Sequence, residues 1–185
     1  MLDLLDVLLE VKLSSIADAL LQKNSLMIYG RSGAGKSLLM NKISTYLAEK
    51  GEKVLYIFNH PSAISNISVS TERIVLLSMN SSVLAKTLIL AGNAIRKGFR
   101  LVVVDEISWD FLYSLAEMRD ILLWVSLLSN LAKSFSKTLV LVSDEEQASL
   151  KLASRYVDSV IRVDRSGNMI SLEWNTGTKL LFKLF

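Results

Sequence analysis

The chain contains the octapeptide Gly30-Arg31-Ser32-Gly33-Ala34-Gly35-Lys36-Ser37. This octapeptide matches the pattern G-x-x-x-x-G-K-[ST] at every fixed position. Glycines permit backbone conformations in which consecutive N–H groups converge on one anion. In this pattern the lysine supplies positive charge to the β- and γ-phosphates of a nucleotide, and the serine hydroxyl binds Mg²⁺. The octapeptide therefore predicts a phosphate-binding loop (P-loop, or Walker A motif).

The residues on either side of this loop favour the structural context that it needs. Residues 25–29 form a short apolar run, which predicts a buried strand, and residues 38–50 have the period of an amphipathic helix that ends at Gly51. The positive end of that helix dipole would face the bound phosphates. The predicted nucleotide-contacting residues are Gly30, Arg31, Ser32, Gly33, Ala34, Gly35, Lys36, Ser37 and Leu38.

Length and composition predict one folded domain over residues 1–185. Hydrophobic residues make up 51% of the chain, and only one residue is proline, which excludes a disordered chain. No cysteine is present, so a disulfide framework and a cysteine metal site are excluded. No apolar run is long enough to span a bilayer, and no signal peptide is recognisable, so we expect a cytoplasmic protein without membrane contact. The net charge of +3 permits nucleic-acid binding without indicating it.

The rest of the chain alternates between predicted strands and helices. Further strands are predicted at residues 53–58, 73–78, 100–105 and 138–143, and helices at 83–96 and 115–135. Because parallel strands need crossover connections, this alternation predicts an α/β fold with a mostly parallel sheet covered by helices on both faces.

The two ends differ from this central pattern. Residues 1–22 carry a wide apolar stripe and predict a helical lead-in, which either covers an edge of the sheet or docks on another protomer. Residues 158–185 contain short apolar runs at 159–163, 169–173 and 179–182, separated by turns. These runs predict a C-terminal antiparallel extension.

Asp105 ends the most hydrophobic predicted strand, which we expect to lie beside the strand that leads into the loop. A carboxylate there can accept hydrogen bonds from Mg²⁺-bound water or from Ser37, so Ser37 and Asp105 are the predicted metal-binding pair. Glu106 follows directly and is the candidate general base, with Lys36 as the other candidate catalytic residue. The alternative for Glu106 is a solvated loop carboxylate.

The order of these motifs resembles that of the RecA/RadA recombinase-like ATPases, especially the short archaeal RadA paralogues of the RadB type. The similar stretches, in chain order, are residues 17–21 with 26–30, 51–57, 102–105, 140–144 and 158–163. The resemblance implies a RecA-like core, ATP and Mg²⁺ as cofactors, and a strand ending at Asp144 where the family has a polar sensor residue. It also implies a site between subunits, and hence a homo-oligomer or a recombinase or paralogue partner.

The chain departs from the family pattern after its second predicted strand. The family usually has a catalytic glutamate there, whereas this chain has Phe58-Asn59-His60-Pro61. Loss of a general base typically costs a factor of about 10² to 10⁴ in rate. We therefore expect slow hydrolysis unless Glu106 acts instead; His60 is either a water-positioning residue or, more often for such a residue, a structural one.

Two segments correspond to DNA-contacting loops of the family. Residues 144–156 are short and acidic at their start, which does not favour phosphate contact. Residues 108–119 carry Trp109, Phe111, Tyr113 and Arg119, which either stack on bases or pack against the following helix or a partner.

The expected function is an ATP-binding RecA-like paralogue that acts as an accessory protein in DNA recombination or repair, with weak or partner-dependent hydrolysis and contact with single-stranded DNA. The alternative is an assembly or signalling ATPase whose nucleotide state controls a protein partner without DNA contact. Salt-dependent binding to single-stranded DNA would separate the two.

Overall fold

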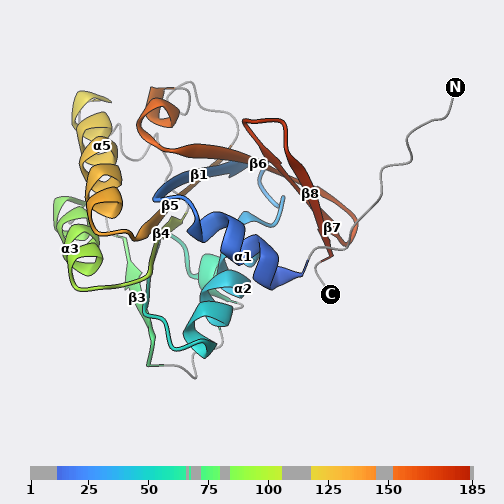
Figure 1. Ribbon diagram of the computed structural model, residues 1–185, viewed down its shortest axis with the longest axis horizontal. Helices are drawn as coiled ribbons and strands as arrows, with labels where there is room; N and C mark the ends of the chain where they lie inside the picture. The colour runs from blue at the N-terminus through green and yellow to red at the C-terminus, as the bar shows by residue number, and fades with distance from the viewer. Residues whose placement is uncertain are drawn as a thin grey trace, which may run out of the picture.

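The computed structural model describes residues 12–65, 67, 72–79, 84–105, 118–144 and 152–183. It is an α/β structure with one eight-stranded mixed sheet flanked by helices (Figure 1). Four predicted features lie outside the described residues: residues 1–11 of the lead-in, Glu106, the three aromatic residues of 108–119, and residues 145–151 of the acidic segment.

The described elements follow the predicted alternation. In chain order they are α1 (Leu13–Leu21), β1 (Ser25–Gly30), α2 (Lys36–Glu49), β2 (Val54–Phe58), the 3₁₀ helix η1 (Pro61–Ile64), β3 (Ile74–Ser78), α3 (Leu84–Arg96), β4 (Leu101–Asp105), α5 (Met118–Ser134), β5 (Thr138–Asp144), the 3₁₀ helix η3 (Ser154–Tyr156), β6 (Ser159–Ser166), β7 (Met169–Trp174) and β8 (Lys179–Lys183).

The strand order in the sheet is β3-β2-β4-β5-β1-β6-β7-β8. Neighbouring strands from β3 to β6 are parallel, and β7 pairs antiparallel with both β6 and β8. The predictions of a mostly parallel sheet and of an antiparallel C-terminal part are therefore confirmed.

The strand order corrects one prediction and extends another. The strand that carries Asp105, β4, does not lie beside β1, because β5 pairs with both and separates them. The first C-terminal strand, β6, is antiparallel to β7 but parallel to β1, so the extension continues the central sheet without a break. The run 159–163 cannot indicate which strands lie beside it or in which direction they run. The same alternation of side chains fits a parallel neighbour, β1, and an antiparallel one, β7.

Two hydrophobic clusters cover the two faces of the sheet. On one face α1 and α2 pack against the sheet, with Ile16 and Ile43 near Ile28 in the first cluster. On the other face α3 and α5 lie side by side, and Ile95 and Leu128 belong to the second cluster (Figure 1). Successive side chains of a strand point to opposite faces, so each central strand contributes to both clusters.

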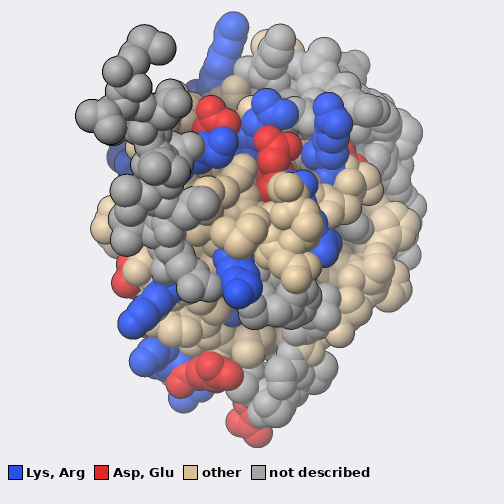
Figure 2. Space-filling model, turned by 90° about the vertical axis from the view of Figure 1, so that its right-hand side faces the viewer, with Lys and Arg blue, Asp and Glu red and all other residues tan. Residues whose placement is uncertain are grey.

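The antiparallel strands are held to the core through one face. Ile170, Leu172 and Phe182 are buried in the first cluster, with α1 and α2. Figure 2 shows the end of the molecule where β7 and β8 lie, with Lys and Arg side chains interspersed with fewer Asp and Glu around uncharged surface. The charge on this end is mixed, and its visible part is not a continuous basic face.

Candidate nucleotide site

The octapeptide forms the connection between the end of β1 and the start of α2. Gly33 and Gly35 have φ angles of 79° and 91°, in the left-handed region that favours glycine. The Ala34 N–H donates to the Arg31 carbonyl at 3.0 Å, which closes a tight turn. No side chain caps the first turn of α2, which runs for 14 residues entirely within the described part of the chain. Such a loop at a helix N-terminus presents N–H groups and the positive end of a dipole to an anion.

Two of the glycines also lie close to the C-terminal strands, and at Gly30 the close atom is backbone, which cannot move aside as a side chain can. A Cβ on Gly30 would lie 2.1 Å from the Val163 carbonyl oxygen of β6, so no side chain fits there. A Cβ on Gly35 would lie 2.7 Å from the Ile170 Cδ1 atom of β7. A Cβ on Gly33 would contact nothing within 4 Å, so only its backbone conformation requires glycine. The loop is therefore fixed against the C-terminal strands, a contact that the motif alone does not predict.

Lys36 lies at the first position of α2, and its side chain is only 8% exposed. Its ammonium group donates to the carbonyls of Gly30 at 2.7 Å and Arg31 at 3.1 Å. It also donates to Asp144 Oδ1 at 2.9 Å, forming an ion pair. The ammonium group thus has one acceptor for each of its three hydrogens, and all three lie around the loop.

Asp105 is completely buried at the end of β4. Its Oδ1 atom accepts a hydrogen bond from Ser37 Oγ at 3.2 Å, and its Oδ2 atom accepts one from the Tyr56 hydroxyl. Because both oxygens are held by donors from different elements, the carboxylate has a fixed orientation. Its orientation places one oxygen next to the hydroxyl of the loop serine.

The structure thus brings together three of the predicted site residues, Lys36 and Ser37 at the start of α2 and Asp105 at the end of β4, although β4 is not a neighbour of β1, the strand that leads into the loop. In the loop, Arg31, Ser32 and Gly33 are exposed and Ala34 is buried. His60, considered as a water-positioning residue, is exposed and precedes η1.

The sequence does not indicate the roles of two residues. Tyr56 lies within a predicted strand, and its hydroxyl donates to Asp105. Asp144 has the position of the family's polar sensor residue, and its carboxylate contacts Lys36 directly. A polar residue at the end of a strand next to the loop strand was the available signal for Asp144. A tyrosine inside a hydrophobic run gives no comparable signal.

The donor set at this site fits Mg²⁺ held together with a phosphate ligand. Ser37 and Asp105 supply oxygen atoms, which Mg²⁺ prefers, and in proteins this ion usually takes few side-chain ligands in addition to phosphates and waters. Among the residues that the structure describes, no group of three or more His, Cys, Asp or Glu side chains could hold a metal ion. A Mg²⁺ ion held by Ser37 and Asp105 would take further ligands from phosphate oxygens and waters.

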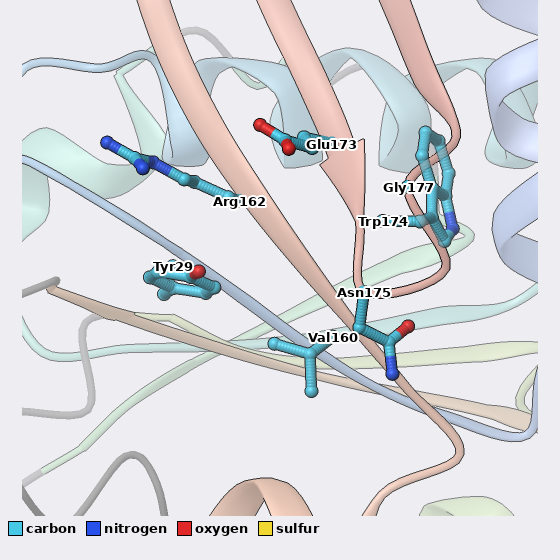
Figure 3. A pocket seen from close by; sticks show the side chains of 7 residues that line it. All are labelled: Tyr29, Val160, Arg162, Glu173, Trp174, Asn175 and Gly177. Carbon is cyan, nitrogen blue, oxygen red and sulfur yellow. The ribbon is translucent and has the colours of Figure 1, made fainter.

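A separate pocket of about 280 Å³ lies over β1 and the C-terminal strands. Its lining includes Tyr29, Arg162, Glu173 and Trp174, and the turn between β7 and β8 closes one side through Asn175 and Gly177 (Figure 3). None of its lining residues belongs to the octapeptide. Tyr29, which lines this pocket, directly precedes Gly30 of the octapeptide.

Neither a scan against protein-family models nor a search of curated proteins finds a match to this chain. Within the described ranges, no helix combines the length and the apolar character needed to cross a membrane.

Proposed function

We propose that this protein binds ATP with Mg²⁺ in the loop between β1 and α2 and hydrolyses it slowly, as a RecA-like P-loop ATPase. The observation that carries the proposal is the convergence of Lys36, Ser37 and the buried Asp105 at a loop with two left-handed glycines. A Gly-rich turn with an incidental lysine would not need a fully buried carboxylate next to its serine. A nucleoside triphosphate is bound by anion-binding amides, a cation and metal-binding oxygens, and this arrangement matches that set.

Each residue has a distinct part in this proposal. The loop amides and Lys36 bind and neutralise the phosphates, which lowers the cost of charge that develops during phosphoryl transfer. Ser37 and Asp105 hold Mg²⁺, which supplies further charge neutralisation when it is bound. Glu106, outside the described residues, is the proposed base that orients water for attack on the γ-phosphate.

For the biological role we propose an accessory protein of DNA recombination or repair, related to the RadA paralogues and working with a recombinase, a paralogue or further copies of itself. The support is the resemblance of the motif order, together with a mostly parallel sheet that ends in antiparallel strands. The mixed charge on the visible end of the molecule favours modest rather than strong contact with single-stranded DNA (Figure 2).

A second candidate function is a nucleotide-dependent assembly module that controls a protein partner. It is favoured by large apolar side chains exposed on the helices α3 and α5, which pack side by side. Ile89, Leu123 and Leu127 are 54%, 65% and 47% exposed. Exposed apolar side chains grouped on one layer are typical of protein-binding surfaces.

The test is the rate of ATP hydrolysis with and without single-stranded DNA, combined with DNA binding at several salt concentrations. The recombination proposal predicts slow turnover that DNA or a partner changes, and a DNA affinity that falls as salt rises. Lys36→Ala should abolish turnover, whereas Lys53→Ala, which removes the same charge from an exposed position, should not. Turnover that persists in Lys36→Ala would contradict the ATPase proposal, and DNA binding that is absent at low salt would favour the assembly module.

The role of Glu106 can be tested separately in the same assay. If Glu106 is the base, Glu106→Gln should lower turnover by about 10² or more without weakening nucleotide binding. Equal turnover of Glu106→Gln and the parent protein would assign water activation to another group or to a partner.

A further inference from the structure

We propose that Asp144 is a specificity-determining residue of the nucleotide site, because it competes with the nucleotide phosphates for the ammonium group of Lys36. This inference rests on the proposed function and adds to it a residue that sets which ligands the loop accepts. Competition for Lys36 gives a role to a carboxylate beside an anion-binding loop, where a negative charge is otherwise unfavourable.

The sheet places Asp144 next to the loop. β5 pairs in parallel with β1, and Asp144, the last residue of β5, is the register partner of Gly30, the first residue of the octapeptide. Its Oδ1 atom lies 2.9 Å from the Lys36 ammonium nitrogen. The Gly30 and Arg31 carbonyls accept the other two hydrogens. In this state the ammonium group is fully used within the protein, so a phosphate must displace at least one acceptor to bind it.

The acceptor that is easiest to displace is Asp144. The Gly30 carbonyl belongs to the backbone of a loop packed against β6, so it cannot leave without a shift of the strand end. The Asp144 side chain is 63% exposed, and water can solvate it as soon as the ion pair opens. An ion pair with one exposed partner is weak for this reason, so a phosphate that binds Lys36 displaces Asp144 at small cost.

The carboxylate remains near the loop after the ion pair opens. Two negative groups at short distance repel, so a bound polyphosphate near Asp144 is disfavoured unless its charge is partly neutralised. Mg²⁺ and the Lys36 ammonium group provide that neutralisation. Asp144 therefore makes the site selective for Mg²⁺-bound di- and triphosphates over inorganic phosphate and monophosphates, which offer less charge for Lys36.

The experiment compares the parent protein with Asp144→Asn and Asp144→Glu by titration calorimetry. Asp144→Asn removes the competing charge and should bind inorganic phosphate more tightly, on the order of fivefold, with a smaller gain for Mg²⁺-ATP, because the metal already neutralises part of that ligand's charge. The ratio of the Mg²⁺-ATP affinity to the phosphate affinity should therefore be lower in Asp144→Asn than in the parent. Asp144→Glu keeps the carboxylate and should resemble the parent. Asp18→Asn, which removes one exposed charge on α1, is the matched control and should leave all affinities unchanged.

Salt separates competition for Lys36 from a merely structural effect. The ratio of the phosphate affinity of Asp144→Asn to that of the parent should fall toward one as salt screens the charge of Asp144. A ratio that does not change with salt, a gain for Mg²⁺-ATP as large as the gain for phosphate, or phosphate binding by Asp144→Asn that is no tighter than that of the parent would overturn the inference. If the parent binds Mg²⁺-ATP but Asp144→Asn behaves identically, only this inference fails. If neither protein binds Mg²⁺-ATP, the proposed function fails with it.

Discussion

The ends of β4 and β5 lie close together in the sheet, and each carries an aspartate at its last position, yet the two carboxylates are in opposite environments. Asp105 is completely buried and accepts hydrogen bonds from Ser37 and Tyr56. Asp144 is 63% exposed and is held through its ion pair with Lys36. The first carboxylate is fixed by the fold, and the second can leave its partner at small cost.

Under the proposed function, the two environments suit two different tasks at one edge of the sheet. A metal-binding oxygen would be useful only if its position is preset, and burial with two donors presets the position of Asp105. A residue that discriminates between ligands would have to move, and exposure allows Asp144 to do so. Substitutions at the two positions should therefore act on different quantities.

The largest effect is expected from Asp105→Asn on the Mg²⁺ dependence of ATP binding. Loss of the buried charge next to Ser37 should weaken Mg²⁺-ATP binding by about 10- to 100-fold. ATP binding measured in EDTA should change little, because Asp105 acts through the metal. Calorimetry with and without Mg²⁺ makes the comparison, and an equal loss in both conditions would contradict a metal-binding role for Asp105.

A smaller effect is expected from Tyr56→Phe on stability. This substitution removes the hydroxyl that donates to the buried Asp105, so a buried charged acceptor loses a partner. The free energy of unfolding should fall by about 1–2 kcal/mol, measured by urea unfolding. Tyr46→Phe, on the partly exposed side of α2, is the control and should change it by less than about 0.5 kcal/mol. Equal effects of the two substitutions would show that the Tyr56 hydroxyl does not hold Asp105.

The smallest effect is expected from Asp144→Asn on the same unfolding curve. Because the Asp144 side chain is mostly exposed, its ion pair should contribute less than about 1 kcal/mol to stability. Urea unfolding of the parent and of Asp144→Asn should nearly superimpose. A loss as large as that of Tyr56→Phe would remove the distinction between a fixed and a displaceable carboxylate.

Most of the fold could be predicted from the sequence, because its periodic patterns are strong and local. The strands at 54–58, 101–105 and 138–144 are apolar runs that only a buried parallel sheet accommodates, and their boundaries agree within one or two residues. The strand order could not be predicted. Whether β5 lies between β1 and β4 depends on how helices pack on both faces, and that information is spread over distant residues.

The candidate site was predictable where one motif specifies it and not where the fold assembles it. Lys36 and Ser37 follow from the octapeptide, and Asp105 follows from its place at the end of an apolar run. The contacts of Tyr56 with Asp105 and of Asp144 with Lys36 join residues 49 and 108 positions apart, and no local pattern encodes them. The steric need for Gly30 likewise comes from β6, far along the chain.

The most direct test of the central claim is calorimetric titration of the protein with Mg²⁺-ATP, with Lys36→Ala and Lys53→Ala alongside. We expect saturable binding by the parent and by Lys53→Ala, and an affinity at least about tenfold lower for Lys36→Ala, since a charged hydrogen bond to phosphate is lost. Absence of binding heat in the parent, or equal affinities for the parent and Lys36→Ala, would contradict that claim.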